Sequence, residues 1–116
     1  MAPASDRVPP PPKRYREIAA RFPEVTGAYE ALQRATAAAG PLSGRERELV
    51  KFGLAVGAGL DSSARAHVRK GAAFGLTRSE FEQAALLAAT TCGWSRAVMA
   101  LGWVERAFAS ERREGA

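Results

Sequence analysis

The 116-residue sequence has very few of the side chains on which disulfides, metal sites and nucleophilic chemistry depend. It contains one cysteine, Cys92, and one histidine, His67. A single cysteine excludes an intrachain disulfide and is typical of a reducing compartment, so we expect a cytoplasmic protein. A zinc site takes three or four ligands, and one histidine with scattered carboxylates offers too few at suitable spacings. We therefore expect no metal site.

Long apolar runs and clustered basic residues are also missing. No stretch reaches the roughly 20 uncharged apolar residues of a membrane-spanning helix, and the N-terminus lacks the apolar segment of a secretory signal. The formal charge is +5, but the basic residues are spread along the chain and interleaved with glutamate. Phosphate binding favours a continuous basic stripe, which this spacing does not provide. The composition predicts neither a membrane nor a nucleic-acid partner.

No segment alternates apolar and polar residues with the period of two that a β-strand requires, so we predict an all-α fold. About six helices fill a single domain over residues 13–111. The first two cover about 13–22 and 23–39, the third 44–58, and the fourth 61–74; a fifth and a sixth follow on either side of Gly93. The four prolines at 9–12 favour extended polyproline II, which predicts a disordered arm over residues 1–12. Residues 112–116 form a charged tail.

Helix starts are marked by short polar motifs. The tetrapeptides beginning at Ser43 and Thr77, SGRE and TRSE, match the capping box, in which a hydroxyl and a glutamate satisfy each other's backbone amides. Asp61 and Ser95 are the expected N-caps of the fourth and sixth helices. These four signals divide the second half of the chain into its helices.

Glu48 and His67 are the pair most suggestive of chemistry. Helical spacing places Glu48 beside the apolar stripe of the third helix, and His67 on the inward face of the fourth. A short glycine-rich turn makes these two helices antiparallel neighbours, so the side chains should meet. A carboxylate and an imidazole can share a proton and act as a general acid/base pair. The alternative is a buried polar pair that only fixes the helix register.

The last two helices carry more apolar surface than one small domain needs. The fifth is apolar almost all round toward its end, which predicts a buried central helix. Trp94, just before the sixth helix, and Trp103, within it, add to this apolar surface. Its extent predicts burial between the subunits of a homo-oligomer. Cys92 in this run is interpreted as a small core hydrophobe, with a reactive thiol as the alternative.

The order of these features resembles the carboxymuconolactone decarboxylase family, which includes the alkylhydroperoxidase D-like proteins. The similar segments are LSGRERELVKFGLAVGAGL, ARAHVRKGAAFGLTRSEFEQAALLAATTCGW and AVMALGWVERAF, which together span about Leu42 to Phe108. The resemblance implies an alkylhydroperoxidase D-like helical domain whose third and fourth helices form a central antiparallel hairpin. It also implies trimers or hexamers with the active site near a subunit boundary.

The resemblance assigns roles to individual residues. In the redox-active branch, a Cys-x-x-Cys precedes the histidine, and Glu48 and His67 occupy the positions of that branch's proton relay. Leu60 and Ser63 occupy the two cysteine positions. A serine cannot cycle through a disulfide, so peroxiredoxin-type activity by the dithiol route is not expected.

The decarboxylase branch uses neither a dithiol nor a cofactor, so the resemblance implies a lyase without cofactors that acts on a small carboxylated substrate. Glu48 and His67 would be catalytic. The substrate carboxylate calls for a guanidinium, and the candidates are Arg45, Arg65 and Arg96. Two alternatives stay open: a non-catalytic oligomeric binding or assembly module, and a thiol peroxidase that depends on Cys92.

Overall fold

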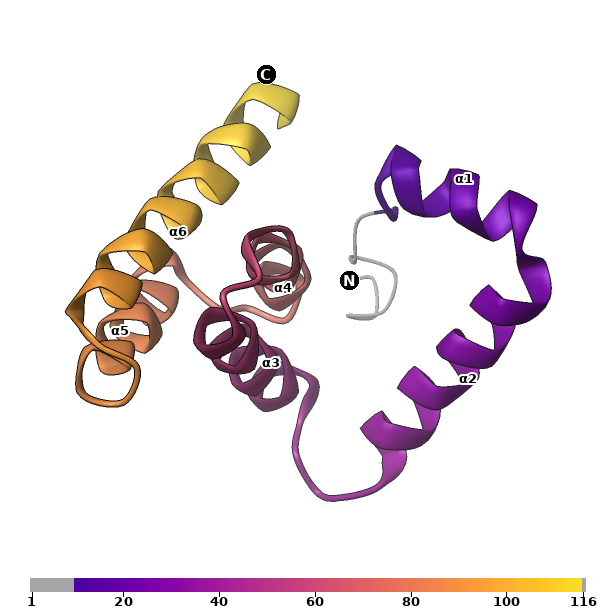
Figure 1. The fold of residues 1–116 in the computed structure, drawn as a ribbon, viewed down its shortest axis with the longest axis horizontal. Helices are drawn as coiled ribbons and strands as arrows, with labels where there is room; N and C mark the ends of the chain where they lie inside the picture. The colour runs from indigo at the N-terminus through magenta and orange to yellow at the C-terminus, as the bar shows by residue number, and fades with distance from the viewer. Residues whose placement is uncertain (1–9, 116) are drawn as a thin grey trace.

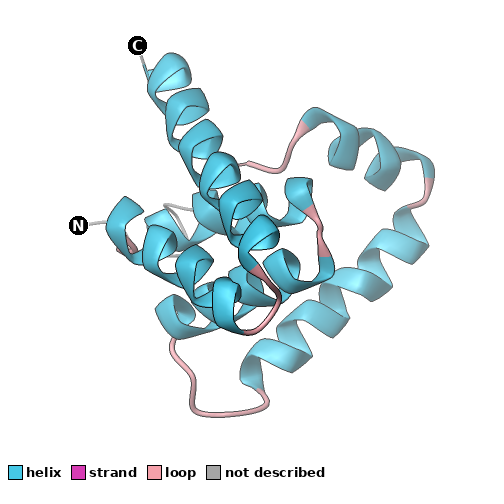
Figure 2. Ribbon diagram, turned by 60° about the vertical axis from the view of Figure 1, so that its left-hand side comes forward, coloured by secondary structure: helices cyan, strands magenta, loops and turns pink. Residues whose placement is uncertain are grey.

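A computed structural model describes residues 10–115, and in this range every regular element is helical (Figure 2). The elements are α1 (Lys13–Arg21), α2 (Pro23–Ala38), α3 (Gly44–Ala58), α4 (Asp61–Ala73), α5 (Arg78–Leu87), the short 3-10 helix η2 (Ala88–Thr90) and α6 (Trp94–Gly115). The predicted all-α fold is confirmed. No helix within this range is both long enough and apolar enough to cross a bilayer.

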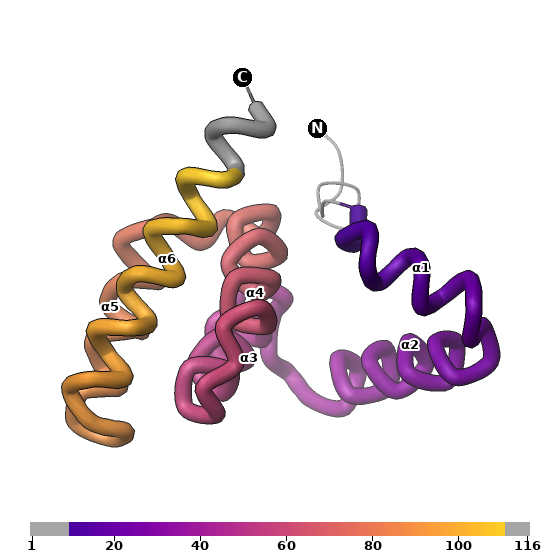
Figure 3. The backbone as a smooth tube through the Cα atoms, turned by 45° about the horizontal axis from the view of Figure 1, so that its top comes forward, coloured from indigo at the N-terminus to yellow at the C-terminus, as the bar shows by residue number. Residues whose placement is uncertain are grey.

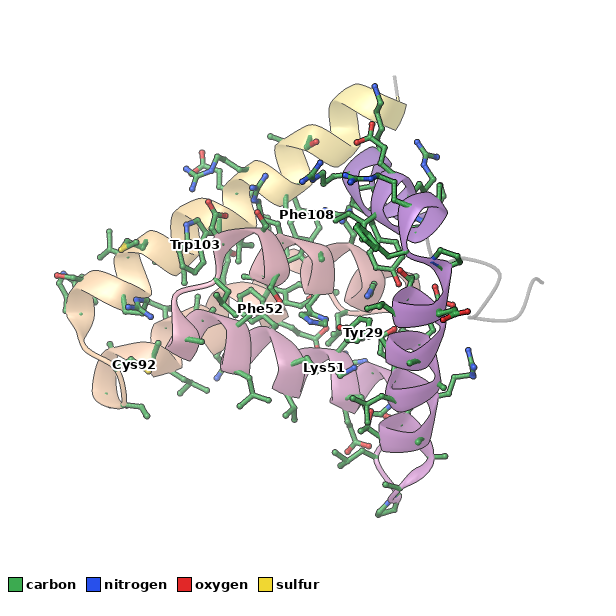
Figure 4. The ribbon with its side chains drawn as sticks, turned by 45° about the vertical axis from the view of Figure 1, so that its right-hand side comes forward. Tyr29, Lys51, Phe52, Cys92, Trp103 and Phe108 are labelled. Atoms are coloured by element: carbon green, nitrogen blue, oxygen red, sulfur yellow. The ribbon has the colours of Figure 1, made fainter. Side chains whose placement is uncertain are left out.

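Helices α3 to α6 pack together and enclose the hydrophobic core (Figure 1). The rings of Phe52 on α3 and Phe81 on α5 meet edge to face, with centroids 5.2 Å apart and an interplanar angle of 63°. Both side chains are completely buried, as is Val104 on α6. Burial of one such side chain stabilises the fold by about 1.5–3 kcal/mol, so these contacts hold α3, α5 and α6 together. Figure 4 shows Phe52 at the centre of this packing.

Helices α1 and α2 form a hairpin that stands to one side of the other helices (Figures 1 and 3). No residue of α1 is buried, and Thr26 is the single buried residue of α2. The apolar face predicted for α2 is largely exposed, with Val25 at 69% and Leu32 at 60% of their full exposure. The hairpin therefore contributes little to the core, and it leaves space between itself and α4.

The two predicted capping boxes are present. Ser43 Oγ accepts a hydrogen bond from the amide of Glu46 at 3.1 Å, and Glu46 Oε1 accepts one from the amide of Ser43 at 2.9 Å. Thr77 and Glu80 make the corresponding pair of bonds at 3.2 and 3.0 Å. The starts of α3 and α5 are thus set by local chemistry.

Two other predicted caps were wrong. Leu60 is the N-cap of α4, and Asp61 lies inside the helix, where its carboxylate accepts a hydrogen bond from Arg65 Nε at 2.8 Å. Ser95 also lies inside its helix, because α6 already begins at Trp94. Asp61 does not cap α4 because its carboxylate is used by the ion pair with Arg65, four positions further along the helix.

The last two helices also differ from the prediction. α5 ends at Leu87 and gives way to η2, and Leu87 is 62% exposed, so α5 is not buried on all sides. Trp103 is buried inside its own domain at 4% exposure, whereas Trp94 is 66% exposed. Of the two tryptophans, Trp94 alone remains available for an intersubunit surface.

The ends of the predicted domain differ as well. α6 continues to Gly115, past residue 111, so the predicted tail is helical as far as the structure describes it. Within the predicted arm, residues 1–9 lie outside the described residues. Pro12 directly precedes α1, and residues 10–12 line a cavity between the hairpin and α4.

Candidate functional site

Glu48 on α3 and His67 on α4 meet as the helical spacing predicted. Glu48 Oε2 lies 2.7 Å from His67 Nδ1, and the two side chains are 13% and 14% exposed. α3 and α4 pack against each other more closely than any other two elements, because Gly59 adopts a left-handed conformation, with φ of 75°, and reverses the chain between them. The contact is therefore held by two adjacent, well-packed helices.

The chemistry of the two groups determines which ring nitrogen stays available. With Glu48 ionised, its carboxylate can only accept a hydrogen bond, which assigns the proton of the contact to Nδ1 of His67. The second ring nitrogen, Nε2, is then the atom that can exchange a proton with another molecule. Glu48 orients the ring, as an orienting carboxylate does for a general acid or base.

His67 lies in the wall of a cavity of about 530 Å³ between the α1–α2 hairpin and α4. Tyr15 on α1 and Tyr29 on α2 line the opposite wall, and residues 10–12 close one side. Figure 4 shows Tyr29 on the side of α2 that faces α3 and α4. The volume falls within the range of small-molecule sites, about 300–1,000 Å³. A small ligand in this cavity would meet the imidazole directly.

Tyr15 contacts a carboxylate in the cavity wall. Its hydroxyl donates a hydrogen bond to Glu30 Oε1 at 3.1 Å. Loss of hydration at this contact, and then the hydrogen bond and negative charge of Glu30, raise the pKa of Tyr15 above its ordinary value. The wall opposite His67 thus presents a neutral aromatic ring at physiological pH.

The three arginines proposed as carboxylate ligands are all engaged elsewhere. Arg45 forms an ion pair with Glu80, and Arg65 pairs with Asp61 at 2.8 Å. Arg96 Nη1 donates hydrogen bonds to the backbone carbonyls of residues 56 and 57, at 2.8 and 2.9 Å, at the end of α3. None of these three arginines lines the His67 cavity.

Three other cations line the cavity in their place: Arg34 on α2, and Arg69 and Lys70 on α4. Sequence reasoning did not select them. Lys70 could have been found, because it lies three positions after His67 and so shares its helical face. Arg34 carries no such signal, since its approach to α4 depends on how the hairpin folds back over the domain.

The remaining candidate residues lie in different places. Ser63 lines the cavity with His67, one helical turn earlier on α4, whereas Leu60 is 52% exposed. Cys92 is exposed and is not part of the cavity, so its interpretation as a core hydrophobe was wrong. Cys92 lies in the turn that follows η2, outside both α5 and α6. Among the described residues, no three His, Cys, Asp or Glu side chains are grouped as metal ligands.

The fold and the site define a class: an all-helical domain in which a Glu–His pair joins adjacent helices and its histidine lines a cavity. The model of the carboxymuconolactone decarboxylase family matches residues 23–106, which is most of the chain. The protein belongs to the carboxymuconolactone decarboxylase family. α1 and residues 10–12 lie before the matched range. Searches of curated proteins and of solved structures found no match.

Proposed function

We propose that this protein is a lyase that catalyses decarboxylation, or a closely related proton transfer, on a small carboxylated substrate without a cofactor. Glu48 and His67 are the catalytic pair. The observation that carries the proposal is the 2.7 Å contact between them, with His67 in the wall of a ligand-sized cavity. The family of the protein agrees with this reaction class.

The proposed reaction needs one proton at the right place. When the C–CO₂ bond breaks, its electron pair passes into the substrate as a carbanion or enolate, which must then be protonated. His67 delivers this proton from Nε2, and Glu48 stabilises the imidazolium before the transfer. Water reprotonates the ring after product release. No electrons are exchanged with a second reactant, so the step balances without an oxidant.

The cavity beside His67 favours a catalytic role for the Glu48–His67 pair over a purely structural one. A Glu–His contact that only fixed the register would need no adjoining space, whereas His67 borders a cavity lined by polar and aromatic side chains. A peroxidase receives no comparable support. Leu60 and Ser63 occupy the expected dithiol positions, and Cys92 lies outside the cavity.

We further propose that the protein is a cytoplasmic homo-oligomer, a trimer or a hexamer. The support is the amount of exposed apolar surface, which monomers seldom tolerate in contiguous patches. Large apolar side chains more than half exposed occur on four helices and in the loops beside them: Val25, Leu32, Val50, Leu54, Leu60, Leu87, Trp94 and Met99. Light scattering coupled to size-exclusion chromatography tests this directly, and a monomer at micromolar concentration would contradict it.

The catalytic proposal is tested with carboxylated lactones and small unsaturated acids in D₂O. The wild-type protein should release CO₂ and place solvent deuterium on the carbon that lost it. His67→Ala should lower kcat about 10²- to 10⁴-fold, the usual contribution of a positioned general acid. Glu48→Gln should lower kcat less, because the amide can still contact the ring.

Arg16→Gln, on the exposed face of α1, is the control. A substrate that His67→Ala converts at the wild-type rate would contradict the catalytic role.

A further inference from the structure

The His67 cavity has an excess of positive charge that the protein does not neutralise. Arg34, Arg69 and Lys70 line it, and Glu30 is the one carboxylate in its wall among the described residues. Glu30 already accepts the hydrogen bond of Tyr15. No carboxylate in the described part of the chain lies within 4.0 Å of any of the three cations.

These cations belong to two facing walls. Arg34 lies on α2, in the hairpin, whereas Arg69 and Lys70 lie on α4, in the core domain. Like charges that face each other across a partly closed space repel, and the repulsion grows as water is excluded. The unliganded protein therefore has an electrostatic reason to keep these walls apart.

The hairpin has little else to hold it against the domain. Within residues 10–110, no hydrogen bond between side chains and no ion pair joins α1 or α2 to helices α3–α6. Its apolar side chains, such as Val25 and Leu32, are mostly exposed rather than packed on the core. Within one subunit, few direct contacts therefore fix the distance between the hairpin and α4.

We propose that Arg34, Arg69 and Lys70 form an anion-binding site, and that a bound carboxylate draws the α1–α2 hairpin onto α4 as a lid over His67. The anion replaces repulsion by attraction on both walls at once. A guanidinium offers a planar pair of donors that fits a carboxylate, and the ammonium of Lys70 adds a point charge. That this anion is the carboxylate of the substrate rests on the proposed function. That the three cations bind an anion does not depend on the proposed function.

The position of the site relative to His67 follows from the helix. Lys70 is three positions beyond His67, which is one turn along the same face of α4. An anion held there leaves the rest of a small ligand between the imidazole and the wall that Tyr15 and Tyr29 line on the hairpin. Closure would also exclude water from the reacting carbon, which strengthens the electrostatic contacts around it. The expected ligand is a small, planar, carboxylated molecule.

Fumarate is a suitable probe, because it is small, planar and carries two carboxylates. Its Kd is measured by calorimetry for the full-length protein at low salt. Arg34→Gln, Arg69→Gln and Lys70→Gln should each weaken binding about tenfold or more, as expected when a charge-assisted hydrogen bond is lost. Arg16→Gln removes an exposed α1 charge that does not line the cavity, and should leave the Kd unchanged.

Closure is measured separately by amide hydrogen exchange. Saturating fumarate should slow exchange in residues 13–38 of the wild-type protein and of Arg16→Gln, but not of Arg34→Gln at equal occupancy. Equal Kd values for Arg34→Gln and Arg16→Gln would overturn the anion site, as would the absence of saturable fumarate binding. Unchanged exchange in residues 13–38 of the fumarate-saturated wild type would overturn the lid.

His67→Ala distinguishes this inference from the proposed function. The variant should still bind fumarate and protect residues 13–38, although it loses turnover. If His67→Ala retains turnover while Arg34→Gln loses fumarate binding, the catalytic proposal fails and the anion site stands. If His67→Ala loses turnover while Arg34→Gln binds as tightly as the wild type, the anion site fails and the catalytic proposal stands.

Discussion

Gly71 on α4 lies directly against the ring of Phe81 on α5. A Cβ atom at position 71 would lie 2.6 Å from Phe81 Cζ and 2.7 Å from a methyl group of Leu76. It would also approach Glu48 Cβ at 3.4 Å. Gly71 is one turn beyond His67, so the absence of a side chain here lets α4 pack closely enough for the Glu48–His67 contact to form.

Replacing Gly71 by alanine should therefore destabilise the fold. Both of the closest groups are buried, so the added methyl must displace core side chains, at a cost of about 1–3 kcal/mol. Urea unfolding measures the change. Gly53→Ala in α3 is the matched control, because a Cβ there meets nothing within 4 Å and should stabilise the helix by up to about 1 kcal/mol. Equal effects at the two positions would contradict the packing described for Gly71.

Arg96 should matter for stability and not for substrate binding. Its guanidinium donates hydrogen bonds to two backbone carbonyl groups at the end of α3, and its Nη1 would lie 3.1 Å from a Cβ atom at position 59. Arg96→Met should lower the free energy of unfolding by about 1–3 kcal/mol, the cost of removing hydrogen bonds from a charged donor. The KM for a carboxylated substrate should not change. A raised KM with an unchanged free energy of unfolding would instead show that Arg96 contributes to substrate binding.

The capping glutamates make stability depend on pH. Hydrogen bonds from the backbone and the side chain of Ser43 lower the pKa of Glu46. The backbone of Thr77, and then the side chain of Arg45, lower that of Glu80. A carboxyl group whose pKa is lower in the folded state stabilises that state above its unfolded pKa, about 4.3 for glutamate. This contribution is lost as the pH falls through the folded pKa.

Unfolding in urea should therefore become easier as the pH is lowered from about 6 to 3. Glu46→Gln and Glu80→Gln should reduce the slope of that dependence, since the amide keeps part of the contact but does not titrate. Glu17→Gln, on exposed α1, serves as the control. An identical slope in all three variants would contradict the role assigned to the capping boxes.

Cys92 should be dispensable for the proposed activity. Its thiol is exposed and lies outside the His67 cavity. Cys92→Ser should leave turnover of a carboxylated substrate unchanged and shift the free energy of unfolding by no more than about 0.5 kcal/mol, as for most surface substitutions. Peroxide consumption by the wild type that disappears in Cys92→Ser would instead establish a thiol peroxidase.

The elements that sequence patterns predicted best depend on short-range interactions. The capping boxes at Ser43 and Thr77 connect residues three positions apart, so their hydrogen bonds follow from local sequence. Helix α5 was predicted less well, because apolar periodicity does not show which apolar side chains find a partner. Leu87 is exposed and Trp103 is buried, and this difference depends on the packing of α6 against the other helices.

The sequence by itself determined the helices, most of their ends, the family, and the meeting of Glu48 with His67. That pair could be predicted because one short turn joins its two helices, which leaves them few ways to pack. Only the tertiary structure decided which cations share the cavity with His67. Lys70 lies on the same helix as His67, whereas Arg34 lines the cavity only because the α1–α2 hairpin lies opposite α4. Arg45, Arg65 and Arg96 are engaged by other partners. Contacts between residues so distant in sequence depend on how all the helices pack, and local sequence patterns do not predict that packing.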